Sequence, residues 1–218
     1  MRTPQPLLIR LTHWINVPTL AVMAMSGLQI FLAYPYFGPR GDAWELPFDI
    51  PEAITAGRWL GGARHLHFAF AWVLVINAIA YLAYLIASGE YKRRLFWPPR
   101  DAKNALRQQL FYVKAFAAKL RRKPAPVEEH HGFYNGLQRA AYTGALGLGI
   151  LEVLSGLALW KPVSLHRLCW CLGGYDGARF IHFAVLVALM LFLVGHIAMV
   201  ALHPKSLAEM VTGGTPRE

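Results

Sequence analysis

The stretch ARFIHFAVLVALMLFLVGHIAMVALH, residues 178–203, decides the fold of this chain. It is apolar over most of its length, and an α-helix needs about 20 such residues to cross a bilayer core about 30 Å thick. It carries His182 and His196, 14 residues apart. At about 100° per residue these two side chains lie on one helical face, about 21 Å apart along the axis. One membrane helix therefore presents one imidazole near each membrane surface.

The composition of the whole chain agrees with a membrane protein. Its 218 residues are 56% hydrophobic and only 16% charged, whereas a soluble domain carries about 25% charged residues. Four segments are long and apolar enough to span, and we place them at residues 11–33, 66–87, 137–160 and 178–202. The sequence therefore predicts one all-α membrane domain, residues 1–218, folded as an up-down-up-down four-helix bundle.

The distribution of positive charge predicts the orientation. The formal net charge is +10, and twelve Lys and Arg lie between Tyr91 and Arg139, within or beside the polar segment 88–136. Basic loops between apolar spans stay on the cytoplasmic side, so we expect both termini to be cytoplasmic and do not expect nucleic-acid binding. Residues 101–120 have a helical apolar pattern that favours an amphipathic helix on the lipid surface, contact with a partner protein being the alternative.

Two further histidines match the depths of His182 and His196. His13 lies near the cytoplasmic start of the first span, and His67 lies near the outer start of the second. Histidines inside spans are costly and indicate function, and paired imidazoles suit a low-spin haem that transfers electrons. We therefore predict the pair His67–His182 outside and the pair His13–His196 inside, as axial iron ligands. His65 stays open as a competitor of His67.

The sequence also contains a weak internal duplication. ARHLHF at 63–68 matches ARFIHF at 178–183, and SGLQIF at 26–31 resembles SGLALW at 155–160. The order is the same in both halves of the chain. The duplication places His67 and His182 at the same relative position, on two helices that enter the membrane from the outer side.

Three arginines accompany the predicted ligands. Arg64 and Arg179 precede the outer histidines by three residues, and Arg10 lies on the inner side. Guanidinium groups bind carboxylates well, so these residues are candidates for haem propionate contacts, with simple head-group anchoring as the alternative.

Polar residues at the start of the third span suggest a quinone pocket near the inner haem. The candidates are Asn135, Gln138, Arg139 and Tyr142. Polar side chains at a span boundary also occur there simply because they face the interface.

The two cysteines give little functional information. Cys169 and Cys171 are too close in sequence for an easy disulfide, and no C-x-x-C-H motif for covalent haem attachment occurs. We expect two small apolar thiols in a loop, although a partial metal site with His166 stays open.

At this point the sequence resembles a known family, the bacterial four-helix di-haem cytochrome b subunits of nickel–iron hydrogenases, formate dehydrogenases and thiosulfate reductases. The carrying motifs are RLTHWIN at 10–16, SGLQIF at 26–31, ARHLHFAFAW at 63–72, ARFIHF at 178–183 and GHIAMV at 195–200. The likeness is greatest to the thiosulfate-reductase-like branch. The long outer loop 34–62 and the extended basic loop depart from the family pattern and leave the partner's identity open.

The resemblance implies a location, cofactors and partners. It implies a protein of the bacterial inner membrane with two b haems, ligated by residues that fall on His13, His67, His182 and His196. It also implies electron exchange between quinone or quinol and a periplasmic oxidoreductase or electron-carrier subunit, such as a molybdenum enzyme. We therefore expect an electron-transfer subunit rather than a self-contained catalyst.

Two other functions stay open from the sequence. One is a self-contained superoxide:quinone oxidoreductase of the same fold, with an outer basic funnel formed by Arg64, Arg179 and Lys161. The other is a haem-free membrane anchor or carrier, which would purify as a colourless protein.

Overall fold

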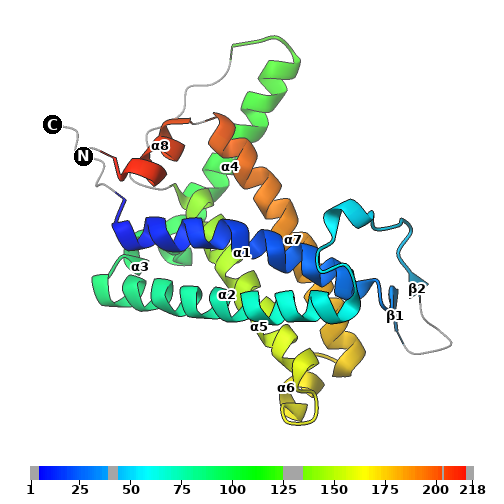
Figure 1. Ribbon diagram of the computed structural model, residues 1–218. Coiled ribbons are helices and arrows are strands. Elements are labelled where there is room, and N and C mark those ends of the chain that lie inside the picture. The colour runs from blue at the N-terminus through cyan, green and yellow to red at the C-terminus, as the bar shows by residue number, and fades with distance from the viewer. Residues whose placement is uncertain (1–4, 39–43, 125–134, 203, 215–218) are drawn as a thin grey trace.

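The computed structural model describes residues 5–38, 44–124, 135–202 and 204–214, and most of these residues are helical (Figure 1). Four helices are long and apolar enough to cross a membrane: α1 (Leu7–Phe31), α2 (Leu60–Ser88), α5 (Gly136–Trp160) and α7 (Gly174–Leu202). They coincide with the four predicted spans, although α1, α2 and α7 begin four to six residues earlier than predicted. The predicted all-helical membrane fold is confirmed.

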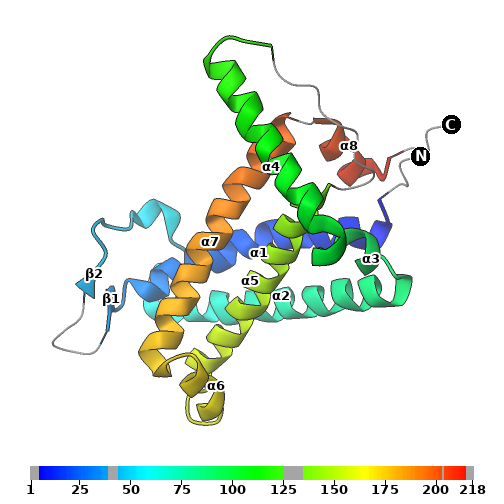
Figure 2. The same ribbon diagram turned by 180° about the vertical axis from the view of Figure 1, so that it is seen from behind.

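The four long helices form two pairs. α1 packs on α2 and α5 packs on α7, and the two pairs cross each other in both views (Figures 1 and 2). Five small residues inside these helices are completely buried, at 0% exposure: Ser26, Ala63, Ser155, Ala158 and Ala178. Small side chains let membrane helices approach closely. Bulky apolar side chains point outward instead, as expected of surfaces that meet lipid tails; Ile76 is 63% exposed and Leu191 is 70% exposed.

The segment between α1 and α2 folds over one end of the helices. It contains an antiparallel ribbon, β1 (Tyr36–Phe37) with β2 (Trp44–Glu45), and a short 3₁₀ helix, η1 (Glu52–Ile54). The ring of Phe183 on α7 stacks on Phe31 at 4.7 Å and meets Phe37 edge-on at 5.3 Å between centroids. These contacts fasten the ribbon to α7. The short helix α6 (His166–Cys171) joins α5 to α7 at the same end.

The opposite end carries the basic segment. α3 (Tyr91–Arg94) and α4 (Pro98–Leu120) follow α2, and α4 is the helix predicted at 101–120. Asp101 is 4% exposed and accepts hydrogen bonds from Arg100 at 2.8 Å and from Arg139 on α5 at 2.9 Å. These bonds, together with the bond from the Trp97 amide, lower the pKa of Asp101 to about 2. Five large apolar residues of α4 are exposed and free to meet lipid or a partner, as expected of an amphipathic surface helix: Leu106, Leu110, Val113, Phe116 and Leu120.

Glycine is required where α4 meets α5. A Cβ added at Gly136 would lie 2.5 Å from the carbonyl oxygen of Asp101, far inside van der Waals contact. The amide of Gly136 also donates to Oδ1 of Asn104 at 2.5 Å. The first turn of α5 is therefore locked directly against the first turns of α4.

The short helix α8 (Pro204–Thr212) returns to the start of α1. The Gln5 amide donates to the carbonyl of Gly213 at 2.8 Å, and the Trp14 indole donates to the carbonyl of Met210 at 3.1 Å. The two ends of the described chain thus lie together, at the end that also bears α3 and α4. Their location on the cytoplasmic side stays a prediction.

Candidate functional site

The structure brings the four predicted histidines together in the two predicted pairs. His67 on α2 faces His182 on α7 with 6.2 Å between ring centroids, and His13 on α1 faces His196 on α7 at 6.0 Å. Two imidazoles that bind one metal from opposite sides, with bonds of about 2 Å, place their centroids about 6 Å apart. Both pairs therefore have the spacing that axial haem ligation needs.

The structure also separates His67 from its competitor. His65 is exposed on α2, whereas His67 is partly buried and faces His182 across the space between the helix pairs. This arrangement favours His67 as the member of the outer pair.

Two serines hold the outer histidines, and their geometry determines the tautomers. Ser26 lies 3.1 Å from Nδ1 of His67, and Ser155 lies 3.0 Å from Nδ1 of His182. Each hydroxyl already donates its proton to the carbonyl four residues earlier, that of Val22 at 2.6 Å or of Leu151 at 2.8 Å. Each serine oxygen must therefore accept from the ring, so the proton sits on Nδ1.

A backbone carbonyl supports the same assignment at His182. The carbonyl of Glu152 lies 3.1 Å from its Nδ1, and a carbonyl can only accept a hydrogen bond. The Nε2 atoms of His67 and His182 are then free of protons, with lone pairs available to a metal. Ligands held in this way by a second hydrogen bond are typical of metal-binding histidines.

A glycine follows each serine and makes room for the ring. A Cβ at Gly27 would lie 3.3 Å from Cε1 of His67, and a Cβ at Gly156 would lie 3.2 Å from Cε1 of His182. Both distances are tighter than ordinary contact. The Ser-Gly dipeptides of α1 and α5 thus fit closely against the imidazole rings on α2 and α7, respectively.

The serines of these two Ser-Gly dipeptides are candidate site residues that the sequence pattern did not reveal. The repeat of SGLQIF and SGLALW contains these serines, but the repeat alone does not indicate what they contact. Ser26 and Ser155 are 129 residues apart, and His67 and His182 are 115 residues apart. The structure shows that the two halves of this duplication meet at the outer histidine pair, each half giving one ring and one Ser-Gly cradle.

The inner pair does not repeat this arrangement. The offset of 129 residues that relates the serines places Tyr142 at the position equivalent to His13. The offset of 115 residues that relates the outer histidines places Tyr81 at the position equivalent to His196, so each half supplies only one inner histidine. The neighbours of the inner rings are aromatic: Trp14 meets His13 edge-on at 5.5 Å, and Phe192 stacks on His196 at 5.9 Å. Within residues 5–38, 44–124, 135–202 and 204–214, neither inner ring has a hydrogen bond.

Glu152 is a second residue that sequence reasoning passed over, although it is the one acidic residue within the four predicted spans. Its Oε1 lies 3.4 Å from Nε2 of His182, the atom that the predicted iron ligation would use. Its Oε2 is buried and has no hydrogen-bond partner in the described part of the chain. If His182 binds iron through Nε2, the carboxyl group of Glu152 has to move away, because the iron takes its place beside Nε2.

The three predicted propionate arginines have different surroundings. Arg179 donates to the carbonyls of Tyr34 and Tyr36, and thereby joins α7 to the start of the ribbon. Arg10 donates to the carbonyls of Met210 and Val211. Arg64 is exposed and lies 5.8 Å from the ring centre of Phe68. Two of the three guanidinium groups thus have backbone partners, and a contact with propionates stays a prediction for all three.

The predicted quinone residues occupy the first two turns of α5. Asn135 and Gln138 form a reciprocal capping box, in which each side chain accepts from the other's backbone amide. Arg139 donates to Asp101, and Tyr142 is half-buried. Three of the four residues therefore have clear structural roles, and their contact with a quinone stays a prediction.

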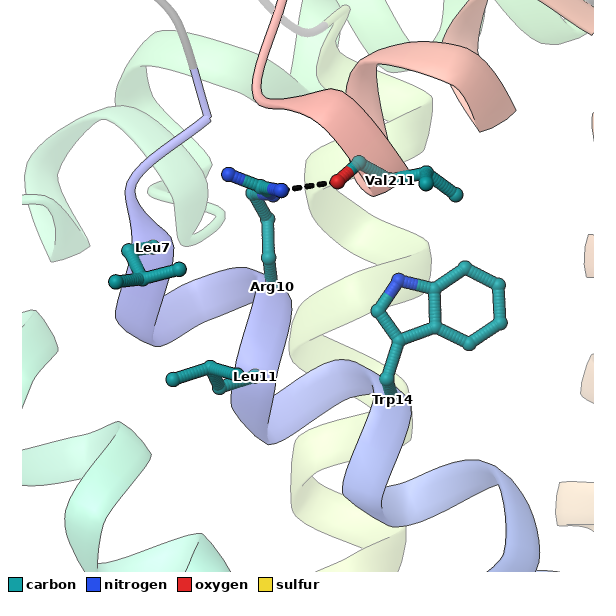
Figure 3. Close-up of a pocket in the computed structure, with 5 residues that line it drawn as sticks. All are labelled: Leu7, Arg10, Leu11, Trp14 and Val211. Carbon is teal, nitrogen blue, oxygen red and sulfur yellow. Dashed lines mark hydrogen bonds between the residues drawn. The ribbon is translucent and has the colours of Figure 1, made fainter.

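A groove lies beside the inner pair, between the start of α1 and the end of α8 (Figure 3). Its volume is about 470 Å³. It is lined by Leu7, Arg10, Leu11, Trp14 and Val211. Figure 3 shows Arg10 reaching the Val211 carbonyl, with the Trp14 indole one turn further along the same helix. Because Trp14 also contacts His13, an occupant of this groove would lie one side chain from a predicted inner ligand.

The cysteines lie apart from these features. Cys169 is buried and packs with Ala158 and Ala178, whereas Cys171 is exposed. In the described ranges no group of three or more His, Cys, Asp or Glu side chains is arranged to hold a metal ion. The open prediction of a partial site with His166 gains no support.

Four spanning helices that hold facing histidine pairs at two depths define a membrane cytochrome of the b type. The chain belongs to the prokaryotic cytochrome b561 family, whose model matches residues 5–213, and this family implies haem b. It is 40% identical over 205 residues to the putative protein-methionine-sulfoxide reductase subunit YedZ1 of Azospira oryzae, covering 94% of this chain and 93% of the relative. The expected thiosulfate-reductase-like branch is thereby corrected, since this relative is named for a different reductase.

Proposed function

We propose that this cytochrome b561-type subunit is a di-haem conduit that carries electrons between the membrane quinone pool and a redox partner outside. The observation that carries the proposal is that two sets of facing histidines lie at opposite ends of α7. Their ring centroids are 6.2 Å apart in the outer pair and 6.0 Å apart in the inner pair. Haem bound at each pair supplies a one-electron carrier. The two imidazoles of each pair would occupy both free positions of a haem iron, so these sites suit electron transfer rather than substrate binding at the metal.

The protein's own residues complete the two sites in different ways. The Ser-Gly cradles orient the outer rings through Nδ1 and keep Nε2 free. The inner rings are held among aromatic neighbours at the boundary with the basic end. Both pairs share α7, which spaces the two carriers across the apolar layer.

The partner is an oxidoreductase subunit. The relative from Azospira oryzae is named as a subunit of a protein-methionine-sulfoxide reductase, and we propose a catalytic partner of this kind for the present chain. The ribbon and the segment between β2 and η1 present exposed aromatic side chains above the outer pair: Trp44 is 49% exposed and Phe48 is 62% exposed. A molybdenum centre in that partner stays a prediction, as does a periplasmic location.

The first experiment counts haem in the purified, detergent-solubilised protein by visible spectra and a pyridine haemochrome assay. We expect two b haems per chain. His67→Ala and His182→Ala should each remove one haem, and His13→Ala and His196→Ala should each remove the other. His65→Ala, two residues from His67 and exposed, is the matched control and should keep both. A colourless protein from haem-replete cells would overturn the proposal in favour of an anchor or carrier.

A second experiment tests quinone exchange at the inner end. Haem reduction by a soluble quinol is timed and compared with full reduction by dithionite. Tyr142→Phe removes only one hydroxyl at the start of α5, whereas Leu11→Trp fills the groove beside Trp14. If haem reduction by quinol is slower in one variant while its haem content is normal, the site of quinone exchange lies at the substituted residue. No reduction of the wild-type protein by any quinol would remove quinone from the proposed function.

A further inference from the structure

The two histidine pairs differ in what their Nδ1 atoms contact. Both outer rings donate from Nδ1 to a serine oxygen, at 3.1 Å and 3.0 Å, and His182 also lies 3.1 Å from the Glu152 carbonyl. Neither His13 nor His196 has such an acceptor in the part of the chain that the structure describes. The duplication explains the difference, because the Ser-Gly repeat is spaced to serve the outer pair only.

A hydrogen bond from Nδ1–H makes an imidazole a stronger electron donor to a metal at Nε2. Electron donation favours the ferric state, so it lowers the reduction potential of the bound iron. Each outer serine is a committed acceptor, because its own proton is given to the carbonyl of Val22 or Leu151. The hydroxyl groups cannot rotate to donate to the rings without giving up those bonds.

Positive charge near the inner pair acts in the same direction. The inner pair lies at the end of the molecule that carries Arg10, one turn before His13, and the basic segments α3 and α4. Nearby positive charge favours the ferrous state, which carries one positive charge fewer.

We propose that Ser26 and Ser155 are positioning residues that make the outer haem the lower-potential member of the pair. This inference rests on the proposed di-haem function. It assigns an order to the two reduction potentials, which the motifs alone left undecided. When the protein carries a single electron, that electron resides on the inner haem. Transfer from the outer end inward is then favourable within the subunit, and transfer outward requires a partner that binds the electron more strongly.

The test is a potentiometric titration of the purified holoprotein, followed in the visible haem bands. We expect two one-electron waves in the wild type. Ser26→Ala and Ser155→Ala should move the lower wave to more positive potential and leave the upper wave in place. Ser26→Thr and Ser155→Thr keep a hydroxyl oxygen, so the lower wave should stay at its wild-type potential in both variants. Thr19→Ala is the matched control, because this buried hydroxyl on α1 also donates to the carbonyl four residues earlier.

A second measurement does not depend on the serine variants. His13→Ala keeps the outer haem and His67→Ala keeps the inner haem, so each protein gives one wave. The wave of His13→Ala should be the lower of the two. The reverse order, or serine variants that move only the upper wave or neither, would overturn the inference while leaving the di-haem conduit intact. A wild-type protein with fewer than two haems would instead refute the proposed function itself.

Discussion

The side-chain amide of Asn77 on α2 donates to the backbone carbonyl of Thr12 on α1 at 2.8 Å. The same nitrogen donates to Oδ1 of Asn16 at 2.7 Å, and Asn77 is only 6% exposed. Thr12 is the residue before His13. A buried amide therefore joins the two helices of the first pair at the level of His13, the proposed inner ligand.

Asn77→Leu should loosen this contact and affect the inner haem first. Interhelical hydrogen bonds in membranes contribute roughly 0.6 kcal/mol each, up to about 1.7, so a loss of about 1 kcal/mol is expected. Thermal unfolding of the holoprotein and the spectrum of the inner haem are the measurements. Ser88→Ala, which removes an exposed hydroxyl of the same helix, should change neither. An unchanged inner haem in Asn77→Leu would show that Asn77 does not position His13.

Alanine at the cradle glycines should disturb the outer haem. In Gly27→Ala and Gly156→Ala the new methyl group lies 3.3 Å and 3.2 Å from the ring carbons of His67 and His182. We expect reduced occupancy of the outer haem in the haemochrome assay. Gly144→Ala and Gly147→Ala are matched controls on α5, since a Cβ at either meets nothing within 4 Å. The controls should keep both haems and gain up to about 1 kcal/mol of helix stability.

The contact of α4 with α5 should weaken in acid. Hydrogen bonds from Arg100 and from the Trp97 amide, with the nearby charge of Arg139, lower the pKa of Asp101 to about 2. An unfolded aspartate has a pKa of about 3.9. A lowered pKa stabilises the fold above the unfolded value, and this contribution is lost as the pH falls through about 4 towards 2.

The measurement is the midpoint of thermal unfolding of wild type and Asp101→Asn between pH 7 and pH 2. The wild type should be the more stable at pH 7, and the difference should shrink towards zero at the acid end. A difference that stays constant over this range would mean that the ionised carboxylate of Asp101 does not hold α4 on α5.

Arg179→Lys should release the outer ribbon. Lysine keeps the charge but cannot donate to the carbonyls of Tyr34 and Tyr36 in the forked geometry of a guanidinium. We expect faster proteolysis between β1 and η1 and slower electron exchange with the partner, at normal haem content. Arg167→Lys, on the exposed surface of α6, is the control. Loss of haem with an unchanged rate of proteolysis would support the propionate role instead.

The sequence predicted the fold and the histidine pairs because both depend on local regularities. A spanning helix needs only length and apolar composition, and the spacing of His182 and His196 follows from the helical repeat. The matched depths of His13 and His67 then left few ways to pair them. The roles of Ser26 and Ser155 could not be read in this way, since a serine inside a membrane helix usually bonds its own backbone.

The amino-acid sequence by itself determined four spans, their basic and neutral ends, and one helix face with an imidazole at each end. These properties arise from composition and helical periodicity, which need no knowledge of neighbours. Only the tertiary structure decided that α1 packs on α2 and α5 on α7, that Ser-Gly on one helix cradles a ring on the next, and that Arg179 is bound by the ribbon. The reason is physical: hydrogen bonds and close contacts between helices depend on their rotation and crossing, which the packing of side chains from distant segments sets.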